Sequence, residues 1–503
     1  MDIPAEFTIT TAEQSQNIDA DTTGKFGIDS FTLMEIAGSS AAKNIRRQVE
    51  PGDRGIFLCG KGNNGGDAQV VARYLAQLGI EITLVFISGT DDLSPDAEKN
   101  FNLLQSIEDQ NSAVHLNFTN WSDFDQAVRP DFIIDGMLGT GLDSNLRGNY
   151  TDAVNWANQQ PCPIFAMDIP TGLHADSGKI MGNAIKADQT FAFGTRKQGF
   201  YLGDGYEYVG EVVFCELPFP NHFIQRYSSH LIDENWVSPY QSKPARHKYE
   251  AGVVHIIAGS EGLTGAAMMA AKSAWAQGVG AVILICPRGA LQIFENNLPQ
   301  IIKKPVGQRD ENYFKYDHLQ EVSRIISQKK GPVLIGPGLG RKESTVEFVN
   351  NLLAETRRSF IIDADALWAI SQQAEWEKPE ESEWILTPHP GELSRLFDVD
   401  INNDLQRLNE VKTQAHRKDI TLLSKGYPVI LGTPDKHIYL SGYDTRKFSR
   451  AGFGDVLAGK TAAFTALGCP PAESCIRALI DGNKKAVAAL KNNAAPLEPF
   501  DLI

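Results

Sequence analysis

The segment Ser449–Gly459 contains the residues best suited to chemistry in this chain of 503 residues. Gly452 and Gly454 flank Phe453, Asp455 follows, and an apolar run begins at once. This order predicts a glycine turn at a helix N-terminus, where free backbone N–H groups and the helix dipole bind anions. Such a turn can hold a phosphoryl group during transfer while a carboxylate accepts the proton of the attacking hydroxyl. Asp455 is therefore a candidate catalytic base.

Three further motifs of the second half each follow a predicted strand: Gly336–Gly340 (GPGLG), Asp363–Leu367 (DADAL) and Thr387–Glu392 (TPHPGE). A glycine loop lets backbone approach a ligand closely, and the two prolines of the third motif hold His389 outward. Alone, such motifs are more often a turn, a helix cap and a solvated histidine. Because parallel strands end at one edge of a sheet, their joint occurrence indicates a site at that edge.

A second glycine-rich segment, Gly60–Asp67 (GKGNNGGD), lies far upstream and also precedes a predicted helix. Its residues Asn63–Asp67 can cradle a pyrophosphate at that helix N-terminus. Asp135 and Asp168 each end a predicted strand, and we expect both at the same sheet edge as Asn64. The alternative for each aspartate is a local role as the cap of the next turn.

Both halves alternate short apolar strands with amphipathic helices, which predicts α/β domains with mostly parallel sheets. Predicted strands are 55–59, 82–87, 132–135, 164–167, 253–258, 281–286, 333–335, 360–362 and 384–386, then a hairpin of 429–431 with 437–440. Predicted helices include 67–78, 264–277, 455–467 and 472–492. The chain is too long for one core, and a proline-rich polar stretch, 219–248, separates domains 1–222 and 234–503.

Composition excludes several classes of protein. The 62 acidic residues outnumber the 47 lysines and arginines, and a formal charge of −15 argues against a nucleic-acid partner. No apolar leader and no run of membrane-spanning length is present, so we expect a cytoplasmic protein without a membrane partner. The six cysteines form no CxxC pair, which predicts reduced core thiols.

Taken together, the motifs of the second half resemble the ribokinase-like ADP-dependent NAD(P)H-hydrate dehydratases. Besides the motifs above, the matching segments are His247-Lys248, Ile257–Ser260, Thr264–Ala267, Lys425-Gly426 and Gly454–Gly459. The resemblance implies the repair of NADH or NADPH that carries water added across its dihydropyridine ring. A nucleotide phosphoryl group turns the ring hydroxyl into a leaving group, and elimination restores the cofactor. ADP or ATP, with Mg²⁺, is the implied co-substrate.

The resemblance also assigns roles to residues. Asp455 is the base toward the hydroxyl, and Ala266, Gly338 and His389 line the hydrate pocket beside it. The implied nucleotide-binding residues are Lys425, Gly426, Tyr427, Pro428, Val429, Gly452 and Gly454. The chain departs from the family where Tyr427-Pro428-Val429 replaces the usual Ala-Gly-Thr, which removes a phosphate-binding hydroxyl. Phe453 likewise replaces a small residue or threonine. Both departures fall in the nucleotide half of the site.

The first half, from about Thr10 to Leu217, resembles the NAD(P)H-hydrate epimerases through GKGNNGGD, Leu138–Leu142 (LGTGL) and Asp168–Leu173 (DIPTGL). The implied hydrate-binding residues are Asn63, Asn64, Gly65, Gly66, Asp67, Gly139, Thr140, Gly141, Leu142, Asp143 and Asp168. The implied ligands of a K⁺ ion are Asn64, Asp135 and Thr171. Asp168 is the candidate general base or hydrate-binding carboxylate. Three departures are Ala68 for the usual Gly, Gly136 for the usual Ala and Ile36 for the usual Asn.

These expectations combine into one bifunctional repair enzyme that binds hydrated NADH or NADPH and an adenine nucleotide. A Rossmann-like, three-layer N-terminal domain would interconvert the R and S hydrates, and a ribokinase-like α/β C-terminal domain would dehydrate the S epimer. A homo-oligomer, a tetramer or larger, is also implied. Two alternatives are a ribokinase-like small-molecule kinase, and a nucleotide-binding regulatory protein with one degenerate half.

Overall fold

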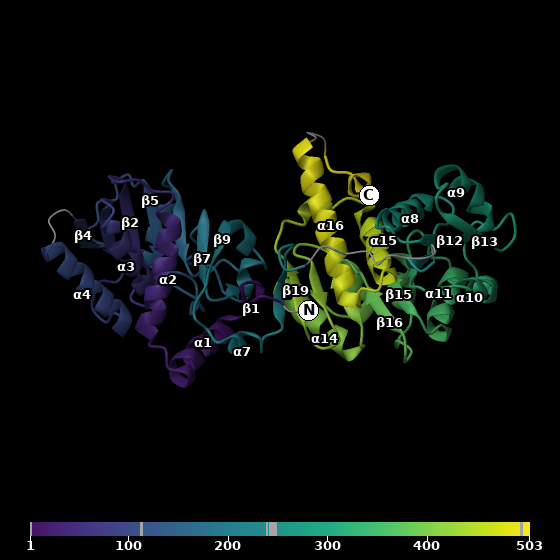
Figure 1. The fold of residues 1–503 in the computed structure, drawn as a ribbon, viewed down its shortest axis with the longest axis horizontal. Helices are drawn as coiled ribbons and strands as arrows, with labels where there is room; N and C mark the ends of the chain where they lie inside the picture. The colour runs from purple at the N-terminus through teal and green to yellow at the C-terminus, as the bar shows by residue number, and fades with distance from the viewer. Residues whose placement is uncertain (1–2, 111–113, 238–239, 241–248, 493–495) are drawn as a thin grey trace. The chain divides into compact units, whose positions relative to one another are not determined.

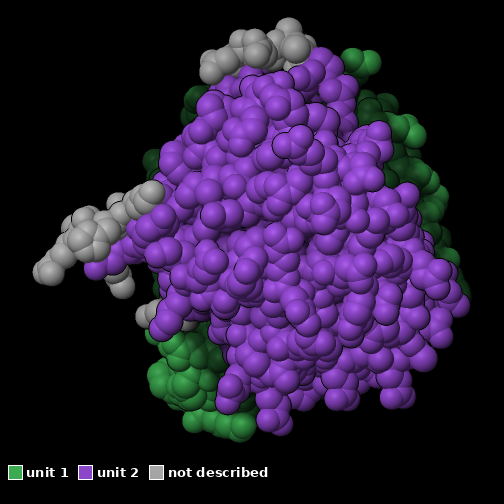
Figure 2. Space-filling view, turned by 90° about the vertical axis from the view of Figure 1, so that its right-hand side faces the viewer, with its two compact units in different colours: residues 1–230 green, residues 231–503 purple. Residues whose placement is uncertain are grey.

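The computed structural model describes residues 3–110, 114–237, 240, 249–492 and 496–503, and it divides into two compact units, Met1–His230 and Leu231–Ile503 (Figures 1 and 2). Each unit has its own mostly parallel sheet covered by helices, which confirms the predicted α/β class. Pro239, Pro244 and the His247-Lys248 motif lie outside the described residues.

The sheet of unit 1 has seven parallel strands in the order β4-β3-β2-β5-β6-β7-β9. Their bounds are β2 (Arg54–Cys59), β3 (Glu81–Phe86), β4 (His115–Asn120), β5 (Phe132–Gly136), β6 (Ile164–Met167), β7 (Gln189–Phe193) and β9 (Glu211–Cys215). The chain leaves β2 toward β3 on one side and returns to β5 on the other. Ligands gather at such a switch point in parallel sheets.

Both faces of this sheet are buried, as a three-layer fold requires. Phe57, Phe132 and Phe165 fill one face, while Ile56, Leu58 and neighbouring side chains pack on the other. The main helices are α1 (Ala12–Asp21), α2 (Ser30–Ile45), α3 (Asn63–Ala76), α4 (Pro95–Gln110) and α5 (Asn149–Asn158).

The sheet of unit 2 has ten strands in the order β10-β19-β18-β17-β16-β15-β14-β11-β12-β13. The bounds are β10 (Ser229–Ile232), β11 (Val253–Ile257), β12 (Ala281–Pro287), β13 (Ile302–Val306), β14 (Val333–Ile335), β15 (Ser359–Ile362), β16 (Glu383–Leu386), β17 (Thr421–Ser424), β18 (Ile430–Gly432) and β19 (Ile438–Ser441). Strands β11 to β17 pair in parallel, and β17, β18 and β19 pair in antiparallel fashion. The switch point of this sheet lies between β11 and β14.

Helices α8 (Thr264–Ala276) and α15 (Phe453–Ala466) pack against each other in unit 2. A Cβ on Gly459 would lie 2.1 Å from Ser273 Oγ and 2.3 Å from the Ala270 carbonyl oxygen, so this approach requires glycine. The remaining helices of eight residues or more are α10 (Leu319–Ser327), α11 (Glu343–Glu355), α13 (Pro390–Phe397), α14 (Asp404–Arg417) and α16 (Pro471–Asn492). The close contact fixes the direction of α15 and hence of its N-terminus.

Every strand predicted from the sequence is present, with each end within one residue of the prediction. One helix prediction was wrong at its start: α3 begins at Asn63, four residues before the predicted Asp67. The NNGGD string is therefore the first turn of the helix and not the loop before it. The six cysteines are free thiols, and among the described residues no helix has the length and apolarity to span a membrane.

The contact between α3 and β5 explains two departures from the epimerase pattern together. A Cβ on Gly136 would lie 2.5 Å from the Cβ of Ala68 and 2.7 Å from the Asn64 carbonyl oxygen. The family usually has glycine at position 68 and alanine at position 136, and this chain has the reverse. One methyl group fits between helix and strand, and two do not.

We therefore expect Gly136→Ala to lower the free energy of unfolding of unit 1 by about 1–3 kcal/mol, the usual effect of overpacking a core. Adding Ala68→Gly should recover at least about 1 kcal/mol, because contacting residues do not contribute additively. Denaturant unfolding of both single variants and the double variant measures this coupling. Additive single effects would contradict the shared-space explanation.

Candidate active sites

A cavity of about 630 Å³ opens at the carboxyl edge of the unit 1 sheet. Of the predicted hydrate-binding residues it is lined by Asn63, Asn64, Asp67, Gly139, Thr140, Gly141 and Asp168. Ser15 and Asp19 of helix α1 also line the cavity. Lys197, which is far from them in the sequence, is a further lining residue. The switch point of the sheet thus contains a pocket large enough for a small-molecule ligand.

Asp168 follows β6 and has a left-handed backbone, with φ of 59°. Its Oδ1 pairs with the ammonium group of Lys197 and accepts a hydrogen bond of 3.2 Å from the Phe193 N–H. The Lys197 side chain is 1% exposed and also donates to the carbonyl oxygens of Phe193 and Thr195. The Asp168 carboxylate thus lies against a buried ammonium group, and its left-handed backbone is one that residues other than glycine rarely adopt.

Two other carboxyl groups crowd this ion pair. Burial raises the pKa of Asp67 well above its usual value, and the charges of Asp168 and Asp19 raise it further. Desolvation by the pocket wall raises the pKa of Asp19 to about 6, against the opposing effect of Lys197. The pocket therefore holds three carboxyl groups beside one lysine, and two of them, Asp19 and Asp67, have raised pKa values.

The three predicted cation ligands lie in one hydrogen-bonded network behind this pocket. Asp135 accepts bonds from the Thr171 N–H and hydroxyl, both of 2.7 Å, and from the Met137 N–H. Asn64 donates to the Leu138 carbonyl oxygen at 3.1 Å, and the Leu138 N–H donates to the Thr171 hydroxyl. Burial raises the pKa of Asp135 to about 6, although these hydrogen bonds lower it. The Asn64 Oδ1 is buried with no hydrogen-bond partner among the described residues.

In unit 2, the Gly452–Asp455 segment forms the start of α15. Gly452 is the N-cap with φ of 99°, and a Cβ there would lie 2.7 Å from Met269 Sδ. Asp455 follows in the first turn, where burial raises its pKa to about 7, with Asp363 and Asp365 adding to the rise and Lys425 opposing it. The predicted combination of an anion-binding turn and a carboxylate is present, and the carboxylate titrates near neutral pH.

Lys425 follows β17 and lies next to this turn. Its Nζ pairs with Asp363 Oδ1 at 2.6 Å, and a Cβ on Gly454 would lie 3.3 Å from that Nζ. Burial lowers the pKa of Lys425, but the charges of Asp363, Glu392 and Asp455 more than offset this and leave it raised. A permanently charged ammonium therefore lies beside the helix N-terminus, where a phosphate would bind.

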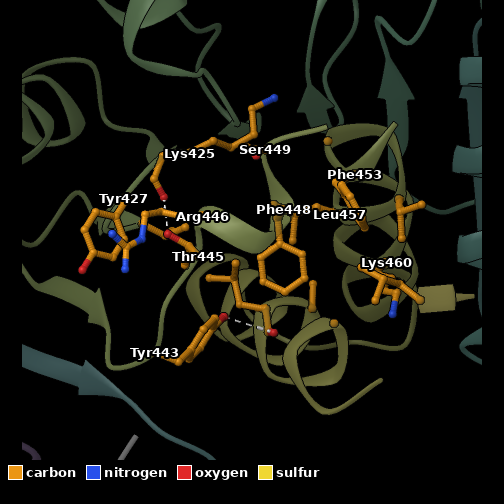
Figure 3. Close-up of a pocket in the computed structure, with 18 residues that line it drawn as sticks. Lys425, Tyr427, Tyr443, Thr445, Arg446, Phe448, Ser449, Phe453, Leu457 and Lys460 are labelled. Atoms are coloured by element: carbon orange, nitrogen blue, oxygen red, sulfur yellow. Dashed lines mark hydrogen bonds between the residues drawn. The ribbon is translucent and has the colours of Figure 1, made fainter. Parts of the chain in front are cut away.

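A mostly apolar cavity of about 410 Å³ adjoins Lys425 and Gly454 (Figure 3). Tyr427 forms part of its wall, and the Arg446 guanidinium lies 4.7 Å from the centre of that ring. The Thr445 hydroxyl donates to the Gly426 carbonyl oxygen at 2.6 Å. Of the predicted nucleotide-binding residues, Lys425, Gly426, Tyr427, Val429 and Gly454 line the cavity. Pro428 and Gly452 do not.

The predicted hydrate-pocket residues of unit 2 lie outside this cavity. The Gly338 backbone, with φ of 60°, approaches the N-terminus of α8, where a Cβ on it would lie 2.4 Å from the Leu263 carbonyl oxygen. Ala266 is in the first turn of the same helix. His389 is the N-cap of α13: its Nδ1 accepts from the N–H groups of Gly391 and Glu392, and its ring edge is exposed.

Family comparisons agree with this division. Residues 30–199 match the family described as YjeF-related protein N-terminus, and residues 254–503 match NAD(P)H-hydrate dehydratase. The bifunctional NAD(P)H-hydrate repair enzyme of Salinibacter ruber is 32% identical over 98% of this chain and 94% of its own length. The enzyme of that name from Moorella thermoacetica is 30% identical over 92% and 89%. The chain belongs to the family of bifunctional NAD(P)H-hydrate repair enzymes.

One solved structure to which this chain is similar is an ADP/ATP-dependent NAD(P)H-hydrate dehydratase from Bacillus subtilis, co-crystallised with ATP and Mg²⁺. It is 23% identical, with a TM-score of 0.44, and covers 52% of this chain and 90% of its own.

Four of the predicted hydrate-binding residues of unit 1 do not line its cavity: Gly65, Gly66, Leu142 and Asp143. Gly65 and Gly66 are buried in α3, where a Cβ on them would lie 2.1 Å from the Gly60 carbonyl oxygen and 2.6 Å from Met34 Sδ. They serve close packing and do not line the cavity. Leu142 and Asp143 lie in the loop after β5, also outside the cavity lining.

Sequence analysis did not single out Asp19 as a site residue. Helix α1 precedes the family match that begins at residue 30, and a single aspartate on a polar helix carries no motif. Its place became evident from the fold, because the helix closes one wall of the pocket. The pairing of Lys197 with Asp168 likewise became evident only from the structure.

Proposed function

We propose that this chain repairs hydrated NADH and NADPH, with residues 1–222 as the epimerase and residues 234–503 as the ADP- or ATP-dependent dehydratase. The observation that best supports dehydration is Asp455 at the N-terminus of α15, with a pKa of about 7, beside Lys425. The backbone N–H groups from Gly452 to Gly454 would stabilise the phosphoryl charge during transfer. Asp455 would accept the proton of the ring hydroxyl.

The nucleotide is expected to extend from this turn into the apolar cavity of unit 2. Its phosphates would lie against Lys425 and the glycine turn, and its base against Tyr427 and neighbouring apolar side chains. Among the described residues no cluster of three acidic, histidine or cysteine side chains could cage a metal ion. Mg²⁺ would therefore arrive with the nucleotide and be held mainly by phosphate and water, as this ion prefers.

Epimerisation follows from the chemistry of the hydrate. Water adds to an enamine with its hydroxyl on the carbon next to nitrogen, so the carbon–oxygen bond can break to an iminium and re-form on the other face. The departing hydroxyl needs a proton, and the incoming water must lose one. Asp168 would exchange that proton, and the neighbouring Asp19 and Asp67 carboxyl groups have raised pKa values.

A K⁺ ion fits the Asn64, Asp135 and Thr171 network. The free Oδ1 of Asn64 and the buried carboxylate of Asp135 offer the oxygen ligands that a hard cation prefers. A cation there would offset the charge of Asp135 and support the loop that carries Gly139–Gly141.

The homo-oligomer implied by the family resemblance stays a prediction.

Asp455→Asn should reduce dehydration of the S hydrate by about 10²–10⁴-fold, the usual effect of removing a general base. ADP binding should persist, because Lys425 and the glycine turn are unchanged. Recovery of the reduced-nicotinamide absorbance, with phosphate release, measures turnover and separates a dehydratase from a kinase. Asp310→Asn changes an exposed aspartate of the same unit and is the matched control. Near-normal turnover in Asp455→Asn would remove Asp455 from this role.

The wild-type rate should rise with pH through about 7, because Asp455 must lose its proton to act as a base and its pKa is about 7. A rate profile of dehydration at saturating ADP measures this acid limb. A limb near pH 4, the usual range of an aspartate, would show that the burial and crowding of Asp455 do not persist in the working enzyme.

Asp168→Asn should divide the repair of mixed epimers into two phases. The S fraction should be restored as fast as in the wild type, and the R fraction should wait for spontaneous epimerisation. Asparagine is chosen because its side-chain oxygen can still accept from the buried Lys197, whereas alanine would remove that acceptor. Asp123→Asn, an exposed aspartate of unit 1, is the control. Single-phase, complete recovery in Asp168→Asn would show that Asp168 is dispensable.

Asp135→Asn should abolish any stabilisation of unit 1 by K⁺ over Li⁺, because it removes the charged ligand. The thermal unfolding midpoint in the two salts at equal ionic strength measures this without using activity. The variant should also need a higher hydrate concentration for epimerisation while leaving dehydration of pure S hydrate intact. An equal K⁺ effect in the variant and the wild type would place the cation elsewhere.

A further inference from the structure

Three adjacent strands of unit 2 converge on one carboxylate oxygen. Strands β15, β16 and β17 pair in parallel, and the residues that directly follow them are Asp363, Thr387 and Lys425. Asp363 Oδ1 accepts a bond of 2.8 Å from the Thr387 hydroxyl and one of 2.6 Å from the Lys425 ammonium group. The Asp363 side chain is 2% exposed, so this oxygen is held away from solvent.

The same ammonium group lies at the start of α15. The ammonium group lies close to the Gly454 backbone, because a Cβ at that position would lie 3.3 Å from the Lys425 Nζ. The next residue is Asp455, and the charges of the two side chains act on each other. Lys425 thus lies within electrostatic reach of three carboxylates, Asp363, Glu392 and Asp455. Glu392 already accepts a hydrogen bond from the His389 N–H, so the buried Asp363 and the proposed base Asp455 are the two that compete for the ammonium group.

The two possible pairings of Lys425 have different consequences. Paired with Asp363, the ammonium stays at the phosphate end of the site and Asp455 keeps a proton affinity suited to catalysis near pH 7. Paired with Asp455, it would neutralise the base and leave the phosphate end. Removing Asp363 would therefore let the Lys425 ammonium group move toward Asp455, because a mostly buried charge needs a partner.

We propose that Asp363 is a positioning residue for dehydration, which holds the Lys425 ammonium at the phosphate-binding turn and keeps it from pairing with Asp455. The inference rests on the proposed dehydratase function. It gives the first aspartate of the DADAL motif a role that the second lacks: Asp365 instead accepts from the Gly340 N–H and pairs with Arg341. Asp363 acts through Lys425 and Asp455 and needs no contact with substrate.

The test is the pH profile of dehydration in Asp363→Asn, which keeps the shape and removes the charge. The loss of a like charge and the release of Lys425 both favour ionised Asp455. The acid limb should therefore move to lower pH by about 1–2 units. The plateau should fall by at least about tenfold, because Lys425 then occupies the base. The charges acting on Asp455 among the described residues are Asp363, Asp365 and Lys425.

Two further variants make the result specific. Lys425→Met should move the acid limb to higher pH, since Asp455 loses its stabilising cation, and this opposite direction cannot arise from a general loss of stability. Thr387→Val removes the other bond to Asp363 Oδ1 but no charge, so its limb should stay within about 0.3 unit of the wild type. Asp363→Glu should restore the wild-type limb at least in part.

A uniformly slower Asp363→Asn with an unmoved limb would overturn the proposal and leave Asp363 a structural residue. If that variant does not fold, an unmoved limb in Lys425→Met overturns it equally. Failure of the dehydratase function itself gives a different outcome: wild-type protein with ADP would not restore the reduced-nicotinamide absorbance at any pH.

Discussion

Both halves of the molecule depend on the convergence of parallel strands at one sheet edge. In unit 2 a single oxygen of Asp363 links the ends of β15, β16 and β17, and in unit 1 Asp135 links the ends of β5 and β6. Each of these carboxylates is buried, which costs free energy unless its hydrogen bonds are satisfied. The strand register satisfies them, because it brings donors from neighbouring strand ends to the same point.

Carboxyl groups outnumber cations in both sites, and this imbalance has a chemical use. Asp455 is crowded by Asp363 and Asp365, and its pKa rises to about 7. Asp67 is crowded by Asp168 and Asp19, and its pKa rises well above the usual value. A base or acid works best when its pKa is near the working pH. Burial and like charge raise a carboxyl pKa in both sheets, and one lysine in each opposes the rise.

The sequence was sufficient for most of the fold, because apolar strands of three to six residues bounded by glycine and proline are distinctive in a parallel sheet. It was also sufficient to place Asp135 at a strand end and Asp455 at a helix N-terminus. The sequence was less informative about which side chains pair with each other. Nothing in the spacing of Asp363 and Lys425, which lie 62 positions apart, indicates that they touch. Nor does any motif place Asp19 of α1 in a pocket made mainly by the strand ends of β2, β5 and β6.

Departures from a family pattern also acquire meaning only through contacts. Ala68 and Gly136 are two changes in the sequence but one change in packing, since both concern the same gap between α3 and β5. The departures at Tyr427 and Phe453 are of another kind. Both side chains are larger than the usual residues of the family, and both line one cavity. The glycine turn beside them keeps its backbone, and backbone N–H groups bind phosphate whatever the intervening side chain is. In the proposed function, the altered wall would change how the nucleotide base is held, while the glycine turn keeps the N–H groups proposed to bind phosphate.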